Sequence, residues 1–210
     1  MKSLILKDLY MLQKAFKMIM VLVGFYIVIF LLTGASDALP MVMAILAVTF
    51  PISTFTYDEA NKWDRYALSG PLRRQDIVCA KYLLCLLLMG LALLIALLGL
   101  TVISFFTASR SLPEILLIVG LSILFGLLGQ AIILPIIYKL GAERGRMLLI
   151  AVLMIPILSI ILYSRFAPPG LQHIVENYLG YLPIVLSFLA VAGYVISYKI
   201  SLRIYMGKDF

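Results

Sequence analysis

The residues best suited to chemistry gather in one polar stretch, residues 57–82, of a chain of 210 residues. This stretch holds nine of the 27 charged side chains, with both signs mixed, and the only tryptophan. Trp63, Tyr66, Ala67 and Gly70 have the i, i+3, i+4, i+7 spacing of one helix face. An aromatic helix face among charges suits either docking into the groove of a protein partner or anchoring at a membrane surface.

The residues around this face predict how the short helix is bounded. Asp58 and Lys62 are four residues apart in the acid-first order that favours an ion pair on a helix. Pro71 ends the short helix and is suited to open the next one. The spacing alone leaves two interpretations equal, a knob for a partner protein and an interfacial loop anchored by Trp63.

Elsewhere the sequence lacks the side chains that catalysis or ion coupling needs. Six long runs contain no Asp, Glu, Lys, Arg or His; they are Met18–Ser36, Ala38–Tyr57, Tyr82–Ser109, Ile115–Tyr138, Met147–Ser164 and Asn177–Tyr198. An intramembrane enzyme or an ion-driven transporter needs such groups at membrane depth. No glycine-rich phosphate loop with a lysine is present, so any transport energy must come from another protein.

The composition predicts one membrane domain covering residues 1–210. The chain is 64% hydrophobic and 13% charged, whereas soluble domains are about 45–50% apolar and about 25% charged. The net charge of +7 is spread among apolar runs, which argues against a nucleic-acid partner. Cys79 and Cys85 lie on different helical faces without a nearby histidine, so we expect neither a disulfide nor a metal site, and no bound cofactor.

The apolar runs predict an all-α, multi-pass membrane protein with six transmembrane helices. Each run approaches the roughly 20 residues that cross a bilayer, and backbone in lipid must be helical to satisfy its hydrogen bonds. Fifteen of the 17 Lys and Arg residues fall on one side of this topology, and only Arg110 and Arg165 on the other. The positive-inside rule therefore places both termini and the 57–82 loop in the cytoplasm.

The N-terminal residues 2–17 predict an amphipathic helix at the cytoplasmic membrane surface. Ile5, Leu9, Leu12 and Phe16 recur at helical spacing, and the lysines fall elsewhere on the wheel. The alternative is a simple continuation of the first span.

A few polar or small residues inside the spans are candidates for a pathway. Thr49 and Ser53 belong to a hydroxyl strip in the second span, and Gln130 is the strong hydrogen-bonding group deep in the fourth. Contact with substrate is one role, and hydrogen bonding between helices is the commoner one. Gly90 and Gly99 are predicted to allow close helix approach in the third span.

Two motifs carry a family resemblance. Residues 58–82 read D-E-x-x-K-W-D-x-Y-A-L-S-x-P-L-x-R-x-D-I-V-x-x-K-Y, and residues 135–146 read P-I-I-Y-K-L-G-A-E-R-G-R. The first resembles the cytoplasmic loop of type-2 ABC transporter permeases, and the second resembles their fourth-to-fifth loop. The nearest group is the compact Gram-positive permeases that include phenol-soluble modulin exporter subunits. With the six predicted spans, the resemblance covers the whole chain.

The resemblance implies how the chain works in a bacterial cell membrane. Two permease copies, or one with a related subunit, pack together among membrane lipids, and each docks on a separate ABC ATPase that binds ATP and Mg. The loop between the second and third spans becomes a coupling helix. The residues implied to contact the ATPase are Glu59, Lys62, Trp63, Asp64, Tyr66 and Arg74, supported by Lys139 and Glu143. Ile174 and Tyr178 lie in residues 171–178, which match external re-entrant helices that gate exit.

The function predicted from these features is that of the permease subunit of an ATP-driven exporter, not itself an enzyme. A pathway lined by Leu, Phe, Met and a few hydroxyls suits a hydrophobic or amphipathic substrate. The alternative is a non-transporting membrane scaffold or immunity protein. A secondary transporter is disfavoured because the spans are uncharged.

Overall fold

The computed structural model describes residues 2–34, 36–70, 72–107, 111–152, 154 and 182–208. Every regular element in these ranges is an α-helix, as the apolar runs predict. The labelled helices are α1 (Lys2–Thr33), α2 (Ala38–Ala60), α3 (Trp63–Leu68), α4 (Arg74–Thr107), α5 (Leu112–Leu140) and α8 (Leu182–Met206). Residues 142–152 are helical as well.

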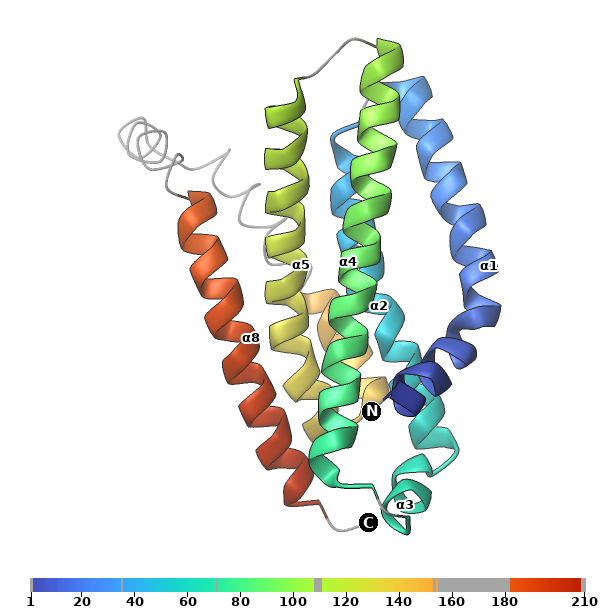
Figure 1. Ribbon diagram of the computed structural model, residues 1–210, viewed down its shortest axis with the longest axis vertical. Coiled ribbons are helices and arrows are strands. Elements are labelled where there is room, and N and C mark those ends of the chain that lie inside the picture. The colour runs from blue at the N-terminus through green and yellow to red at the C-terminus, as the bar shows by residue number, and fades with distance from the viewer. Residues whose placement is uncertain are drawn as a thin grey trace.

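The long helices form one bundle (Figure 1). α2 packs against both α4 and α5, and α8 packs along α5. α1 flanks the bundle on the side opposite α8, and short α3 lies across one end (Figure 1). The last turn of α8 and the first turns of α1 lie toward this same end, which is called the α3 end below.

Four described helices are long and apolar enough to cross a membrane: Ala38–Ala60, Arg74–Phe105, Leu112–Leu140 and Pro183–Met206. They coincide with the second, third, fourth and sixth predicted runs. The apolar part of α1, Met20–Phe30, is shorter, and most of the fifth run lies outside the described residues. Six spans therefore remain a prediction, while a multi-pass helical protein is what these four helices indicate.

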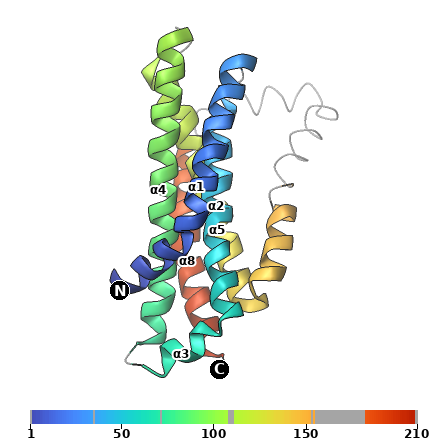
Figure 2. The same ribbon diagram turned by 90° about the vertical axis from the view of Figure 1, so that its right-hand side faces the viewer.

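The N-terminal segment departs from its predicted boundary. α1 is one continuous helix from Lys2 to Thr33, so a separate helix over residues 2–17 is wrong. The reason is that no Gly or Pro interrupts the chain before Gly24, and the hydrogen-bond ladder continues. Figure 2 nevertheless shows the first turns lying across the bundle before α1 turns along it. A position at the membrane surface stays a prediction.

Small residues set the close packing at the centre of the bundle. A Cβ at Gly99 would lie 2.7 Å from Leu39 Cδ2, and one at Gly126 would lie 2.7 Å from Met89 Cε. Such contacts force a shift, so glycine is what lets these helices approach. The prediction is confirmed for Gly99, whereas a Cβ at Gly90 would meet nothing within 4 Å.

A polar network fastens α8 to α4. The buried Tyr82 hydroxyl lies 2.7 Å from the hydroxyls of both Ser197 and Ser201, and Tyr194 Oη donates to the Tyr82 carbonyl at 3.0 Å. The Tyr82 ring also meets the Tyr194 and Tyr198 rings edge-on, each at 5.3 Å between centroids. Hydrogen bonds and aromatic contacts thus join helices that are distant in sequence.

Candidate functional site

The short helix α3 forms because the chain turns sharply after α2. α2 ends at Ala60, and Lys62 adopts a left-handed conformation with φ 50°. This turn takes Lys62 off the helix that carries Asp58, so the predicted Asp58–Lys62 pair is wrong. α4 starts at Arg74, so the prediction that Pro71 opens the next helix is also wrong. Pro71 itself lies outside the described residues.

Asp58 instead belongs to a ring of four charged side chains, Lys7, Asp8, Asp58 and Lys81. Lys7 Nζ lies 3.1 Å from Asp8 Oδ1 and 2.7 Å from Asp58 Oδ1. Lys81 Nζ lies 3.1 Å from Asp8 Oδ2 and 2.6 Å from Asp58 Oδ2. Each lysine therefore contacts both aspartates, and the group is neutral overall. We call these four residues the charge ring; it joins α1, α2 and α4.

The charge ring is largely removed from solvent. The side chains of Asp8, Asp58 and Lys81 are 2%, 6% and 6% exposed, and that of Lys7 is 20% exposed. Lys81 Nζ also donates to Thr54 Oγ1 at 3.0 Å. Burying four charges is costly unless each is paired, and removing one member leaves an uncompensated charge in the protein. The ring therefore favours the arrangement in which all three helices meet.

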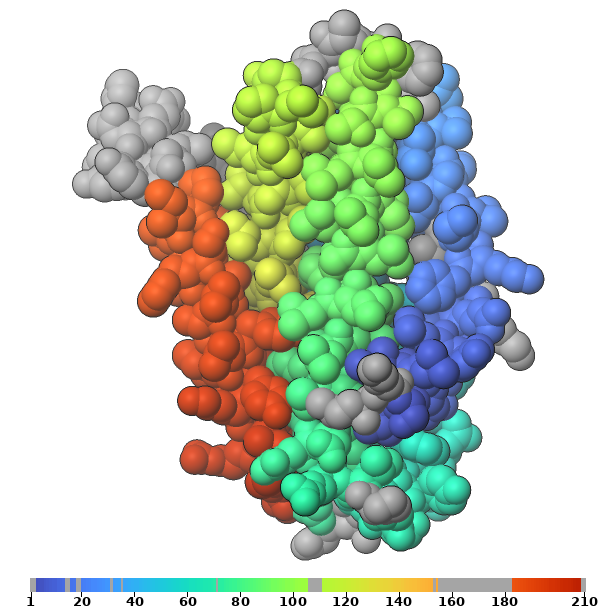
Figure 3. Space-filling model, viewed as in Figure 1, coloured from blue at the N-terminus to red at the C-terminus, as the bar shows by residue number. Residues whose placement is uncertain are grey.

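The charge ring also touches α3. Lys7 Nζ lies 4.1 Å from the centroid of the Trp63 ring, the geometry of a cation–π contact. The centroid of the Trp63 ring in turn lies 5.5 Å from the centroid of the Tyr66 ring. In Figure 3 the N-terminal segment of α1 packs against the lower half of α4, directly above the α2–α3 region. The aromatic residues of α3 are thus linked to the N-terminal segment.

The opposite side of α3 contacts the end of α8. Tyr205 Oη donates to Asp64 Oδ1 at 2.8 Å. The Arg74 guanidinium, at the start of α4, donates to the carbonyls of Tyr205 and Met206. A cation at these last carbonyls suits the negative end of the helix dipole. Tyr205 also packs edge-on against Tyr138 of α5, at 5.6 Å between centroids.

Glu59 connects the two polar loops. Its Oε1 accepts a hydrogen bond from the backbone N–H of Ala142 at 2.8 Å, at the start of the helical residues 142–152. A carboxylate here satisfies an N–H that the helix leaves unpaired. Gly141, with φ 90°, precedes this contact, and a Cβ there would lie 3.3 Å from Glu59 Oε1. The loops that the sequence expected to act together therefore meet.

The predicted ATPase-contact residues divide into two groups by exposure. Those with exposed side chains are Glu59, Lys62, Tyr66, Lys139 and Glu143. Those that are half-buried and engaged within the protein are Trp63, Asp64 and Arg74. The fold brings Glu59, Trp63, Asp64 and Arg74 together at the α3 end. Their contact with a partner stays a prediction.

The predicted pathway residues lie apart from this site. Thr49 and Ser53 are half-buried, and Thr49 Oγ1 donates to the Leu46 carbonyl of its own helix at 3.1 Å. Gln130 is buried, and its Nε2 donates to the carbonyls of Ala47 and Cys85 at 3.1 and 3.4 Å. Its amide thus bridges α5 to α2 and α4. The remaining pathway candidates, Ile174 and Tyr178, lie outside the described residues.

Sequence reasoning missed the charge ring. Asp8 went unremarked, and Lys7 was placed with the lysines off the apolar stripe, because that stripe was read through Ile5, Leu9, Leu12 and Phe16. The structure buries Leu4, Asp8 and Leu12, which are spaced by four. An acid in the middle of a buried i, i+4 stripe is the signal that could have revealed it. Lys81, which contacts Asp8 in the structure, was interpreted as the last residue of the cytoplasmic loop.

A comparison with known families decides what kind of protein this is. A family model described as ABC-2 family transporter protein matches residues 3–206. The chain belongs to this ABC-2 transporter family. No match to a curated protein or to a solved structure was found.

Family membership confirms the predicted type-2 ABC permease. An ABC-2 permease is the membrane component of a transporter and is not itself catalytic. The four helices apolar enough to cross a membrane fit an integral membrane protein. Among the described residues, no group of three His, Cys, Asp or Glu side chains is placed to hold a metal ion.

Proposed function

We propose that this ABC-2 permease exports a hydrophobic or amphipathic substrate, powered by a separate ABC ATPase that binds ATP and Mg. Family membership implies such an ATPase partner in general. The observation that supports a coupling role for α3 is its attachment to the bundle. It contacts the charge ring through Trp63 and the end of α8 through Asp64.

α3 has an inner side fixed to the protein and an outer side that is free to bind. Ala67 is 3% exposed, and Trp63 and Leu68 are half-buried. On the outside, Tyr66 is 73% exposed, and Lys62 and Arg65 are exposed. An aromatic ring flanked by cations is an effective anchor in a partner's groove. We assign this outer side to the ATPase, together with the exposed Lys139 and Glu143.

A displacement of α3 would reach most of the bundle. On one side it acts through Lys7 on α1, α2 and α4, because the charge ring joins these three helices. On the other side it acts through Asp64 on Tyr205 and α8. Buried networks of this kind resist gradual stretching, so motion of α3 is expected to move helices as rigid bodies.

The assembly we propose contains two permease subunits in a bacterial cell membrane, each with its ATPase. The α3 end, with both termini, faces the cytoplasm, as the distribution of Lys and Arg predicts. Within the family we place the chain near the compact Gram-positive permeases that include phenol-soluble modulin exporter subunits, on its two loop motifs. Amphipathic peptides are then the first substrates to test.

The test is co-purification of the proposed ABC ATPase from native membranes, using the double variant Lys62→Glu/Tyr66→Ala. Both side chains are exposed, so the variant should insert in the membrane with unchanged thermal stability. We expect loss of the ATPase from the purified complex. The matched control is Lys199→Glu, at an exposed position of α8, and this variant should retain the ATPase.

Undiminished ATPase association in the double variant would refute the role of α3. Transport is measured separately, as ATP-dependent movement of a fluorescent amphipathic peptide in membrane vesicles. An ATPase-bound complex that moves no substrate would contradict export and favour the scaffold alternative.

A further inference from the structure

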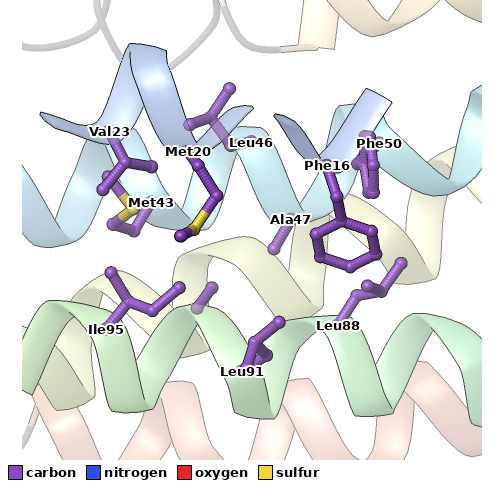
Figure 4. A pocket seen from close by; sticks show the side chains of 11 residues that line it. Phe16, Met20, Val23, Met43, Leu46, Ala47, Phe50, Leu88, Leu91 and Ile95 are labelled. Atoms are coloured by element: carbon purple, nitrogen blue, oxygen red, sulfur yellow. The ribbon is translucent and has the colours of Figure 1, made fainter. Parts of the chain in front are cut away.

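An apolar cavity of about 250 Å³ lies between α1, α2 and α4. Its walls include Phe16 and Met20 of α1, Leu46 and Phe50 of α2, and Leu91 and Ile95 of α4. Figure 4 shows these side chains pointing into the space between the three ribbons, with the Phe16 ring at one end. Every lining residue is apolar, so water would find no hydrogen-bonding partner there.

The cavity is accessible from the outside of the bundle. Met20, in its α1 wall, is 69% exposed. α2 and α4, which form the other walls, are both long and apolar enough to cross a membrane. In an integral membrane protein, the outer surface at this level faces lipid tails. The cavity therefore opens toward hydrocarbon chains.

A second apolar hollow shares the lining residue Phe16 with the first. Its volume is about 180 Å³, and it is lined by Leu6, Leu9, Tyr10, Gln13 and Phe16. Phe16 lines both hollows, so apolar surface extends from the bundle to the N-terminal segment of α1. The surface of this second hollow is also apolar, although Gln13 and Tyr10 contribute to its lining.

A positive charge lies close to the second hollow. Lys17 is four residues after Gln13, the spacing at which side chains are neighbours on a helix, and its side chain is exposed. Within the part of the chain that the structure describes, no ion pair is found for Lys17, whereas Lys7 is occupied by the charge ring. A cation close to an apolar groove complements an anionic head group followed by an acyl chain.

We propose that this groove binds one anionic phospholipid, with an acyl chain in the cavity between α1, α2 and α4 and the phosphate near Lys17 and Gln13. Such a lipid supplies both an apolar chain for the cavity and a negative charge for the exposed Lys17. The bound lipid would stabilise the contact of α1 with α2 and α4.

The position of the lipid acyl chain is tested by fluorescence quenching in detergent. Phe16→Trp, in a Trp63→Phe background, places a single tryptophan at the cavity. Titration with phosphatidylglycerol carrying brominated acyl chains should quench it saturably at one lipid per protein. The matched control is Phe188→Trp in the same background, since Phe188 is 76% exposed on α8 and remote from the cavity. It should show only weak, non-saturating quenching.

The head-group preference is tested with the same reporter. We expect brominated phosphatidylglycerol to bind about fivefold more tightly than brominated phosphatidylcholine, about the effect of one lysine at an anionic surface. Lys17→Gln should abolish this difference, and Lys199→Gln, another exposed lysine, should not. Equal binding of both lipids to the protein that retains Lys17 would overturn the anionic head-group assignment.

A cavity-filling variant tests the acyl chain independently. Ala92 lines the cavity and is 9% exposed, so Ala92→Leu should fill part of the space. Saturable quenching should weaken at least tenfold, while the thermal midpoint without lipid stays equal or rises. If this variant loses its fold, Met20→Phe, which alters the exposed wall without adding a second tryptophan, replaces it. Unchanged quenching in a folded filled variant, or equal quenching at Phe16→Trp and Phe188→Trp, would overturn the site.

Discussion

The two sides of α3 are fastened to the bundle by different means. Toward α1 and α4, the contact passes through Lys7 into the charge ring, where each lysine meets two aspartates. Toward α8, Tyr205 donates a hydrogen bond to Asp64 of α3. Two bonds beside it join the neighbouring elements rather than α3 itself, from Arg74 of α4 to the end of α8 and from Ala142 to Glu59 of α2. One side is a closed ring of charges, and the other is a group of single hydrogen bonds, two of which involve Tyr205.

This difference determines how each side responds to change. In a closed, buried network, the loss of any member leaves charge that nothing compensates. A single neutral hydrogen bond can be lost at a smaller cost, because no unbalanced charge is left behind. We expect the charge-ring side to be rigid and sensitive to single substitutions, and the α8 side to be tolerant.

The largest effect is expected for Lys81→Met. It leaves Asp8 and Asp58 buried with only Lys7 to balance them, and breaking a buried pair costs about 3–5 kcal/mol. The thermal midpoint and the free energy of unfolding in detergent should both fall clearly. Lys199→Met, at an exposed lysine, is the control and should change neither. A Lys81→Met protein as stable as wild type would mean that the ring does not hold the helices.

The next prediction concerns whether the losses in stability from two substitutions add. The losses from Asp58→Asn and Lys81→Met should not add, and a double-mutant cycle should give a coupling of about 1–3 kcal/mol. The losses from Glu59→Ala and Tyr205→Phe should add within about 0.5 kcal/mol, since these residues share no hydrogen bond. Additivity on both sides would remove the distinction between them.

A smaller loss is expected for Glu59→Ala, about 1 kcal/mol, because it removes the acceptor that caps residue Ala142. Glu59→Gln keeps a side-chain oxygen and should retain most of the stability. Hydrogen exchange at the Ala142 amide reports the contact directly and should accelerate only in Glu59→Ala. Equal exchange in the two variants would contradict the capping role.

The smallest effect is expected for Trp63→Phe. A phenyl ring binds a cation less well than an indole, and the Lys7 contact is worth about 0.5–1 kcal/mol in total. Overall stability should hardly change. Addition of Lys7→Met should then cost the same in the Trp63→Phe variant as in the wild-type protein, within about 0.5 kcal/mol. A larger difference would show that the aromatic contact is part of the network.

Much of the fold followed from patterns along the chain. Charge-free apolar runs predicted helices, and four of them coincide with α2, α4, α5 and α8 because backbone in lipid must be helical. Boundaries were less predictable. α4 begins at Arg74 rather than Tyr82, since Ile77 and Val78 are buried and extend its packing beyond the apolar run. α1 continues where a break was expected, because no residue there stops a helix.

The site was only partly predictable. The sequence picked out Trp63, Asp64 and Arg74, and all three lie at the α3 end with defined partners. The sequence pattern paired Asp58 with Lys62, four residues away, because residue spacing predicts contacts only within a single helix. The true partners, Lys7 and Lys81, come from two other helices.

What the sequence by itself determined is the class of protein. Composition, apolar run length and two loop motifs lead to a helical membrane permease, because the bilayer restricts which segments can cross it. Only the tertiary structure decided which charges meet. Asp8, Asp58 and Lys81 are separated by up to 73 positions in the chain, and their pairing depends on how α1, α2 and α4 pack. Coulomb attraction acts through space, and only the fold sets those distances.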